Sequence, residues 1–273
     1  MSQNKLKSLS VAAVLALGLL AGCGGKTQES KTLSTTNWAI GVTGGPHEQV
    51  VNKVKELAAK DGITIDVKVF SDYNTPNTAL AEGSLDMNNY QTLPFLVDQK
   101  NAKGYKITEV FETTAFPMAI YSDKIKDIKA LKSGDRVAVP NDPANELRAL
   151  RLFEAAGLIK LKEGLTESAT KRDIAENPLN LEFLELPAAQ LPSQLPELAA
   201  AAINANFALS SNLSAAEQGI FKEASDVAYP NYVVVRDENV NDEAVALFKK
   251  YYYSDEVRTF INDKFQGAIV PLF

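Results

Sequence analysis

Residues 137–148 combine a strand end, a tight turn, a helix start and a cation. The segment reads VAVPNDPANELR, so an apolar run ends in an Asn-Asp-Pro turn that opens a helix. Helix N-termini present unpaired backbone N–H groups and a partial positive charge, which favour a small anion. Arg148, in the opening turns of the helix, can hold a carboxylate through two hydrogen bonds. The pattern predicts a binding site for a small carboxylate at this turn.

A second interpretation explains the same residues equally well. Asn141 and Asp142 are common helix caps, and a helical arginine often pairs with an acidic side chain on the surface. In that case the turn and Arg148 only stabilise the helix. The pattern alone leaves both interpretations open.

Several aromatic residues lie at predicted strand ends or in loops: Tyr73, Tyr90, Phe95 and Phe116. Such residues can line an apolar pocket, although aromatic side chains at these positions more often belong to the core. Asn204 and Asn231 also stand near predicted strand ends, where they are candidates for polar contacts.

Enzymatic chemistry has few candidate residues in this chain. His47 is the only histidine, and it stands at a predicted helix start in the sequence GGPHE. No G-x-S-x-G elbow accompanies it, and the nearby glycines lack the G-K-[ST] ending of a phosphate loop. We expect His47 to be a surface or capping residue and the glycines to form a turn. We therefore expect a protein that is not an enzyme.

The composition excludes further classes. One His and one Cys cannot supply a structural zinc site, so we expect no metal and no cofactor. The 273 residues include 28 basic and 34 acidic side chains, for a formal charge of −6, whereas a nucleic-acid binder needs a basic face. A hydrophobic fraction of 45% is typical of a globular protein that buries a core.

The N-terminus has the pattern of a secretory signal. Lys5 and Lys7 precede an apolar run over residues 9–20, which is shorter than the roughly 20 residues that span a bilayer as a helix. The run ends in the tetrad LAGC, which resembles a bacterial lipobox. We therefore predict a signal peptide at residues 1–22 and lipidation of Cys23. The alternative is an ordinary cleavage site followed by an unrelated cysteine.

Residues 23–36 are predicted to form a lipidated, flexible tether. They contain one large apolar residue, Leu33, among Gly, Ser, Thr and Lys. A chain acylated at Cys23 stays attached to a membrane because several acyl chains hold far more firmly than one. The sequence thus predicts a protein of the bacterial cell envelope, anchored by lipid on a periplasmic or extracellular face.

The remainder alternates short apolar runs with amphipathic stretches. Ile63, Ile65, Val67 and Val69 alternate with polar or smaller residues, as in a strand with one buried face. The order β-α-β-α-β predicts a mostly parallel sheet with helices on both faces. In this first series we predict strands at 38–42, 63–70, 85–90 and 107–111, and helices at 46–60, 76–82 and 94–103.

A second series follows residue 117. We predict strands at 118–121, 136–140, 179–185, 198–204 and 232–235, and helices at 146–156, 242–252 and 255–265. The chain is long for one open sheet, so two α/β lobes fit it better. Ligands in such folds bind in a crevice outside the carboxyl ends of strands.

The ordered set of motifs resembles the methionine-binding lipoprotein family, also called MetQ/NlpA. The resemblance covers nearly the whole chain after the signal and is carried by FSDY at 70–73, DMNNYQ at 86–91, VAVPNDP at 137–143, GLIKL at 157–161, ENP at 176–178 and SDEV at 254–257. It implies a two-lobed periplasmic-binding-protein fold of type 2 with a ligand cleft between the lobes. Lobe I would comprise residues 37–117 and 229–273, and lobe II residues 118–228.

The family resemblance also implies a function and a set of ligand-binding residues. The protein would capture L-methionine or a related amino acid and deliver it to the permease and ATPase subunits of an ATP-binding-cassette (ABC) importer. Arg148 matches the family arginine that holds the ligand carboxylate. Asparagines match positions around the amino-acid head: Asn145, Asn204 and Asn231. Aromatic residues match positions around the thioether side chain: Tyr73, Tyr90, Phe95 and Phe116.

One position departs from the family pattern. Many members have a histidine in the turn where this chain has Thr92, which alters the size or polarity of the pocket wall. Another apolar amino acid or a short peptide is therefore an alternative ligand. A surface lipoprotein with an adhesin or interaction role is the alternative from a different functional class.

Overall fold

A computed structural model of the chain describes residues 32–215, 217–224 and 229–273. The predicted signal peptide and Cys23 lie outside the described residues. Within the described part of the chain, no helix combines the length and apolarity needed to cross a membrane.

The first sheet has the order β13-β4-β12-β3-β1-β2. Its strands are β1 (Asn37–Thr43), β2 (Thr64–Phe70), β3 (Met87–Thr92), β4 (Ile107–Ala115), β12 (Pro230–Arg236) and β13 (Val270–Pro271). β1 pairs in parallel with β2 and β3, but β12 lies between β3 and β4 and is antiparallel to both. Since β3 and β4 are both antiparallel to β12, β4 runs in the same direction as β1, β2 and β3, as predicted for this series. The sequence did not predict that the antiparallel β12 lies between β3 and β4.

The central place of β12 follows from its side chains. Val233, Val234 and Val235 are fully buried, and they alternate between the two faces of the sheet. A strand that is apolar on both faces needs neighbours and covering helices on both sides. The returning C-terminal segment meets this need by pairing between β3 and β4.

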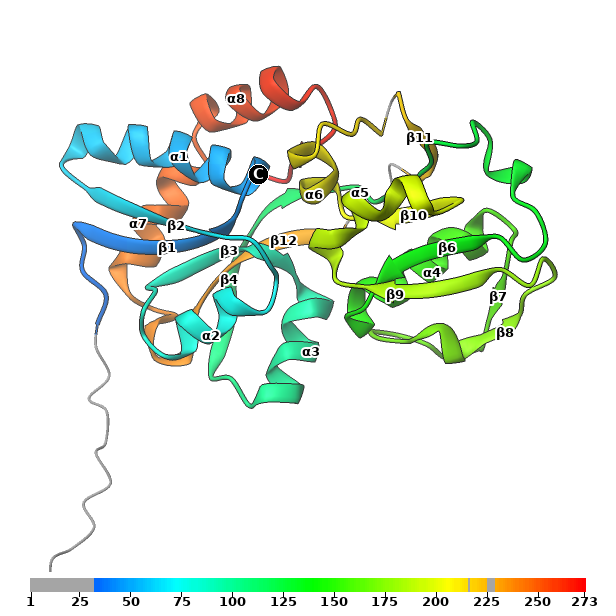
Figure 1. The fold of residues 1–273 in the computed structure, drawn as a ribbon. Helices are drawn as coiled ribbons and strands as arrows, with labels where there is room; N and C mark the ends of the chain where they lie inside the picture. Colours follow the sequence, from blue (N-terminus) through cyan, green and yellow to red (C-terminus); the bar gives the residue numbers. More distant parts are fainter. Residues whose placement is uncertain (1–31, 216, 225–228) are drawn as a thin grey trace, which may run out of the picture. The chain divides into compact units, whose positions relative to one another are not determined.

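Helices cover both faces of the first sheet (Figure 1). On one side lie α1 (Pro46–Ala58), α7 (Glu243–Tyr252) and α8 (Asp255–Phe265), whose core residues include Val54, Phe248 and Ile261. The other face is covered by α2 (Thr75–Ala81) and α3 (Leu93–Lys103), which contribute Leu80 and Leu96 to a smaller core. We call this part of the chain lobe I.

The second sheet has the order β11-β5-β10-β6-β9 and is also mixed. Its strands are β5 (Ala119–Tyr121), β6 (Arg136–Pro140), β9 (Glu182–Leu186), β10 (Ala200–Ile203) and β11 (Gly219–Lys222). β6 is parallel to β9 and β10, whereas β5 is antiparallel to β10 and β11. We call the part of the chain around this sheet lobe II.

The helices of lobe II include the one predicted from the Asn-Asp-Pro turn. They are α4 (Pro143–Ala155), α5 (Leu191–Gln194) and α6 (Ala205–Ser210). A separate pair of strands is formed by β7 (Lys160–Leu161) and β8 (Ile174–Glu176). Single-turn helices complete the fold: η1 (Ala59–Asp61), η2 (Ile128–Ala130), η3 (Lys171–Asp173), η4 (Ala188–Gln190), η5 (Leu195–Glu197) and η6 (Asp237–Asn239).

The two-lobed α/β class predicted from the sequence is confirmed, and both sheets belong to one compact unit. The chain leaves the first sheet after Ala115 and returns to it at Pro230. The exact lobe boundaries, 117/118 and 228/229, stay a prediction. The short elements that the sequence analysis missed are β7, β8, β11, β13, α5 and α6.

The last residues of the predicted tether pack against lobe I. Leu33 is only 5% exposed and belongs to the core beneath α7 and α8. Its backbone N–H donates to Asp242 Oδ2 over 2.8 Å, and Trp38 Nε1 donates to Ser34 O over 2.6 Å. The one large apolar residue of the predicted tether therefore belongs to the fold, because burying its side chain removes apolar area from water.

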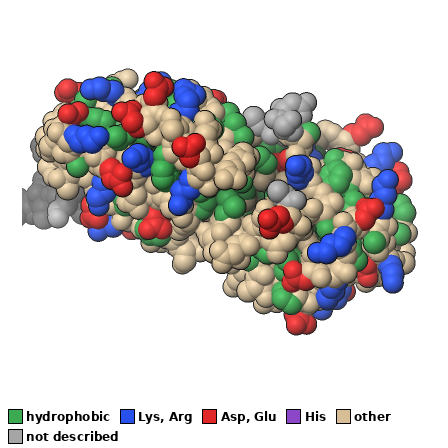
Figure 2. Space-filling view, turned by 90° about the horizontal axis from the view of Figure 1, so that it is seen from above, with side chains coloured by type: hydrophobic (Ala, Val, Ile, Leu, Met, Phe, Trp, Pro, Cys, Tyr) green, Lys and Arg blue, Asp and Glu red, His purple; other side chains and the backbone are tan. Residues whose placement is uncertain are grey.

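The surface carries both signs of charge. In the face shown in Figure 2, Lys and Arg side chains are interspersed with Asp and Glu. A phosphate-binding surface presents basic side chains without intervening acids. This face has no such continuous basic area.

Candidate functional site

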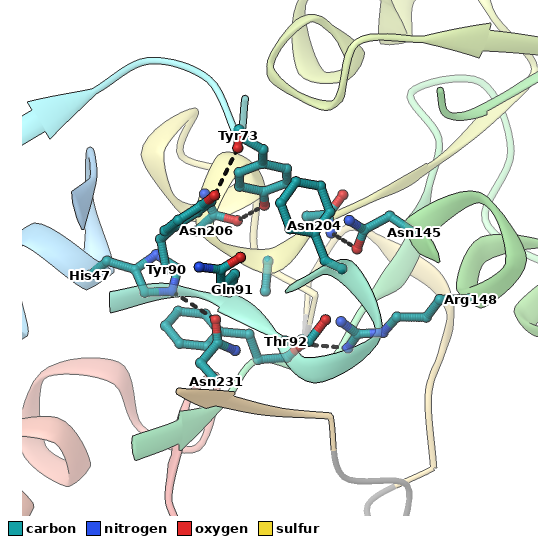
Figure 3. A pocket seen from close by; sticks show the side chains of 13 residues that line it. His47, Tyr73, Tyr90, Gln91, Thr92, Asn145, Arg148, Asn204, Asn206 and Asn231 are labelled. Atoms are coloured by element: carbon teal, nitrogen blue, oxygen red, sulfur yellow. Dashed lines mark hydrogen bonds between the residues drawn. The ribbon is translucent and has the colours of Figure 1, made fainter. Parts of the chain in front are cut away.

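A pocket of about 350 Å³ is lined by residues from both lobes (Figure 3). Its lining includes all the residues predicted to bind ligand: Tyr73, Tyr90, Thr92, Phe95, Phe116, Asn145, Arg148, Asn204 and Asn231. Residues that were not predicted complete the lining: His47, Gln91, Ala205 and Asn206. The structure thus brings the predicted set together, as expected for the carboxyl ends of strands in α/β folds.

Strand ends explain why these residues meet. β3 ends with Tyr90, Gln91 and Thr92, and the register of the first sheet pairs Thr92 with Asn231 at the start of β12. In lobe II, β10 ends just before Asn204, while β6 leads through the Asn-Asp-Pro turn into α4. The polar side chains therefore stand on secondary structure that a buried core holds in place.

Arg148 is buried and paired with an acidic residue. Its Nε donates to Glu223 Oε1 over 2.7 Å, and its Nη2 donates to Glu223 Oε2 over 2.6 Å and to the carbonyl of Phe116 over 2.7 Å. The guanidinium also lies 4.2 Å from the centre of the Tyr229 ring. Among the described residues, Nη1 has no hydrogen-bond partner, so it can donate to a ligand.

The capping interpretation of the Asn-Asp-Pro turn is partly correct, and the carboxylate site stays a prediction. Asp142 caps α4, because its Oδ1 accepts from the Asn145 backbone N–H over 2.9 Å. Arg148 does pair with an acid, but the prediction that this pair lies on the surface is wrong. Arg148 and Glu223 have side chains that are 6% and 5% exposed. A buried pair holds the guanidinium in one orientation beside the pocket.

A chain of amides runs from Asp142 into the pocket. Asn145 Nδ2 donates to the Asp142 carboxylate, with distances of 2.9 and 3.1 Å to its oxygens. Asn204 Nδ2 then donates to Asn145 Oδ1 over 2.8 Å (Figure 3). Asn204 Oδ1 is buried and has no hydrogen-bond partner among the described residues. The site therefore presents one unsatisfied acceptor, which costs free energy unless a ligand donates to it.

His47 is a pocket residue, so the prediction of a surface or capping role is wrong. It is 3% exposed, and its ring stacks on Phe116 with centroids 4.3 Å apart. Its Nδ1 lies 2.8 Å from Thr43 Oγ1, and its Nε2 lies 3.2 Å from Asn231 Oδ1. Burial lowers the pKa of His47 to about 4. The ring is therefore neutral at pH 7, with Nε2 donating to Asn231 and Nδ1 accepting from Thr43.

The glycines before His47 form the predicted turn, and Gly45 adopts a φ of 87° at the start of α1. The turn brings Thr43 within hydrogen-bond distance of His47. Thr43 Oγ1 is also 3.4 Å from Asn206 Nδ2 of lobe II. Asn231 turns its Oδ1 toward His47 and hence its Nδ2 away from it.

Aromatic rings form one end of the pocket. The ring centroid of Tyr73 lies 6.0 Å from Tyr90, 5.8 Å from Phe95 and 4.8 Å from Phe207. Tyr90 and Phe95 are nearly fully buried, so these residues serve both the core and the pocket. The Tyr73 hydroxyl donates to Asn206 Oδ1 over 2.5 Å and links the two lobes at this wall.

Sequence reasoning missed the partners that orient the site. Glu223 follows β11, a short strand that no apolar pattern marked. Asn206 lies in α6, which has only six residues and no amphipathic period to predict it. One available signal was its position two residues after Asn204, within the opening turn of a helix that follows a strand.

Comparisons with known proteins agree on one family. The profile of the NlpA lipoprotein family matches residues 39–273. A Vibrio cholerae protein named "Probable D-methionine-binding lipoprotein MetQ" is 44% identical over 268 residues, or 97% of each chain.

Solved structures give the same relationship. A nutrient-binding protein from Burkholderia cenocepacia, solved bound to methionine, is 42% identical with a TM-score of 0.84 over 86% of this chain and 100% of the other. An ABC transporter periplasmic substrate-binding protein from Coxiella burnetii is 40% identical with a TM-score of 0.82, covering 86% of this chain and 99% of the other. Since the family profile and full-length relatives match almost all of the folded part, the chain belongs to the NlpA lipoprotein family.

Proposed function

We propose that this protein is a lipid-anchored solute-binding protein that captures methionine and delivers it to an ABC importer. The observation that carries the proposal is the set of unsatisfied groups in the pocket. Among the residues that the structure describes, Arg148 Nη1 is a cationic donor without a partner, and Asn204 Oδ1 is an acceptor without one. An α-carboxylate and an α-ammonium group would satisfy these two positions.

The opposite end of the pocket suits a thioether. Sulfur packs favourably against ring edges, and the rings of Tyr73, Tyr90 and Phe95 lie about 6 Å from one another. Phe116, Thr92, Asn231 and Asn145 also line the pocket.

The relatives' names support the same ligand and role. The Vibrio cholerae relative is named for D-methionine, and the Burkholderia cenocepacia structure contains methionine. The Coxiella burnetii structure is described as part of an ABC transporter. We extend these roles to this chain, with permease and ATPase subunits as partners, a lipid anchor on Cys23 in the bacterial envelope, and no enzymatic step.

Calorimetry tests the ligand directly. We expect the mature domain without Cys23, unfolded and refolded to remove carried-over ligand, to bind L- or D-methionine with a Kd below about 1 µM, or roughly −8 kcal/mol. Leucine and a methionine-containing dipeptide serve as competing ligands. Absence of heat with both methionine enantiomers would reject the proposal, and absence of heat with all of these ligands would favour an interaction role without a small ligand.

A second test separates the hydroxyl of Tyr73 from its ring. Tyr73→Phe removes only the hydrogen bond to Asn206 across the two lobes, so we expect methionine affinity to fall by about 1 kcal/mol, or roughly fivefold. Tyr73→Leu also removes the aromatic wall and should weaken binding by a further 0.5 to 1.5 kcal/mol, as is typical of aromatic contacts. Titrations of both variants measure the two contributions. Equal affinities of the two variants would place the thioether elsewhere.

A further inference from the structure

None of the described residues that line the pocket is acidic. The polar lining consists of His47, Arg148, Tyr, Thr, Asn and Gln residues, and Arg148 is the sole ionised side chain among the lining residues that the structure describes. A zwitterionic amino acid brings an ammonium group to this pocket. Neutral acceptors must then bind that ammonium group. Asn204 Oδ1 is the buried acceptor that the described residues leave unsatisfied.

An asparagine amide recognises an ammonium group only in one of its two orientations. Its oxygen accepts from the ammonium, whereas its NH₂ would repel it, and the two orientations have nearly the same shape. A neighbouring group must therefore decide which end of Asn204 faces the ligand. In this structure Asn204 Nδ2 is held by Asn145 Oδ1 over 2.8 Å.

The orientation of Asn145 is decided in turn by a carboxylate. Asn145 Nδ2 lies 2.9 and 3.1 Å from the two oxygens of Asp142, which can only accept when ionised. Asn145 and Asn204 are each only 6% exposed. Water therefore has little access to either amide as an alternative hydrogen-bond partner. The side-chain amides of Asn145 and Asn204 then each have one orientation in which their hydrogen bonds to one another and to Asp142 join a donor to an acceptor.

Asp142 is ionised at neutral pH despite its burial. Burial raises the pKa of its carboxyl to about 6, while the bonds from Asn145 act in the opposite direction. At pH 7 the carboxylate therefore supplies two acceptor oxygens.

We propose that Asp142 is a positioning residue that selects an α-ammonium ligand without touching it. Through Asn145 it turns the oxygen of Asn204 toward the ligand. The inference rests on the proposed function, since it assigns Asn204 Oδ1 to the ammonium group of an amino acid. It adds that the discrimination between an ammonium and a hydroxyl group is set by a carboxylate that lies two amides away.

Asp142→Asn tests this relay while retaining the helix cap. Asn and Asp are equally good N-caps, so α4 keeps its start. Because the cap keeps Oδ1 as an acceptor, the new NH₂ takes the place of Oδ2, 3.1 Å from Asn145 Nδ2. It can donate to Asn145 Oδ1 in the reversed amide, so the variant removes the preference of Asn145, and then of Asn204, for the present orientation. In the reversed orientation the pocket would present Asn204 Nδ2, which repels an ammonium group but donates to a hydroxyl oxygen.

The readout is a comparison of two ligands that differ at one group. We expect Asp142→Asn to weaken methionine binding by about 10- to 100-fold, the range for a hydrogen bond to a charged group. Binding of 2-hydroxy-4-(methylthio)butanoate should change by less than about threefold, because its hydroxyl can either donate or accept. Asp127→Asn is the matched control, since Asp127 caps η2 elsewhere in lobe II and accepts from the Lys129 backbone N–H over 2.9 Å. Equal weakening of both ligands by Asp142→Asn would overturn the relay.

A rescue variant provides the sharper test. Asn204→Asp places acceptor oxygens toward both the ligand and Asn145, so it needs Asn145 reversed. In the Asp142→Asn background, we expect Asn204→Asp to raise methionine affinity at least tenfold. In the wild-type background, we expect the same substitution to lower methionine affinity. The same effect of Asn204→Asp in both backgrounds would contradict the proposal.

A failure of the proposed ligand can be separated from a failure of the relay. If the wild-type protein binds neither compound, neutron diffraction of the ligand-free protein and of Asp142→Asn still reports the amide orientations. Asn204 Oδ1 facing the pocket in the wild type, and Nδ2 facing it in the variant, would support the relay. The same Asn204 orientation in both proteins would overturn it.

Discussion

Arg148→Ala is expected to reduce methionine affinity by more than about 30-fold, which corresponds to a loss of roughly 2 to 4 kcal/mol. The variant removes the Nη1 donor that we assign to the ligand carboxylate. It also leaves Glu223 buried, with a side chain 5% exposed and without its cation. Breaking a buried ion pair by removing one partner costs about 3 to 5 kcal/mol of stability. Calorimetric titration and chemical denaturation measure the two losses.

A paired variant separates the loss of binding from the loss of stability. Arg148→Met combined with Glu223→Gln removes both charges and keeps similar side-chain volumes, and such replacements are often neutral for stability. We expect this double variant to regain most of the free energy of unfolding without regaining methionine affinity. Recovery of binding in the double variant would show that the guanidinium does not hold the carboxylate. An Arg148→Ala variant as stable as the wild type would contradict the buried pair.

The Arg148–Glu223 pair also affects how charge is distributed in the pocket. Glu223 engages Nε and Nη2 of Arg148 and accepts from the Met118 backbone N–H over 2.7 Å. The Arg148–Glu223 pair has no net charge. A ligand with a net negative charge therefore gains little electrostatic attraction from it. A zwitterion, which carries both charges, matches one oriented donor and one oriented acceptor. We therefore expect Glu223 to favour amino acids over simple organic anions.

Local patterns explain why part of the site could be predicted. The turn before α4 follows from short-range chemistry, since Asp142 caps the helix and Pro143 begins it. Arg148 is fixed relative to that turn by the helical period alone. A sequence pattern therefore predicts Arg148 beside the Asn-Asp-Pro turn.

The partner of Arg148 could not be predicted in the same way. Glu223 is 75 residues further along the chain, and it approaches Arg148 only because β11 pairs with β5. The chain has 34 acidic residues, and spacing gives none of them a distinguishing mark. Long-range pairing decides which one is buried beside the arginine.

Local sequence patterns could not predict the strand order either. The apolar run that became β12 was correctly predicted as a strand, but its place between β3 and β4 depends on a return of the chain from lobe II. This return places Asn231 beside Thr92 and within reach of His47. The position of β12 and the burial of His47 thus escaped prediction for one reason, because His47 finds its partner Asn231 on the returning strand.

The second large expected effect concerns the pH dependence of stability through His47. Burial lowers the pKa of its imidazole to about 4 from an unfolded value of 6.5. Above pH 6.5 both states are neutral and the contribution is fully present. As the pH falls from 6.5 to 4, the unfolded chain binds a proton that the folded protein does not, so the free energy of unfolding decreases. The shift corresponds to about 3 kcal/mol.

The difference between the wild type and His47→Gln isolates this term. Glutamine can still donate to Asn231 but does not titrate, and contributions from carboxyl groups such as Asp142 largely cancel in the difference. We expect the advantage of the wild type over His47→Gln, measured by denaturation at each pH, to decrease by about 3 kcal/mol between pH 7 and pH 4.

The chain has one histidine, so an untagged protein gives a single imidazole Cε1–H resonance, which reports the protonation of the ring directly. We expect its midpoint in the folded protein near pH 4. A midpoint near 6.5, together with a pH-independent difference between the two proteins, would mean that water reaches the ring. In that case the hydrogen bonds to Thr43 and Asn231 could not hold His47 neutral, and the orientation of Asn231 would have to be set by another group.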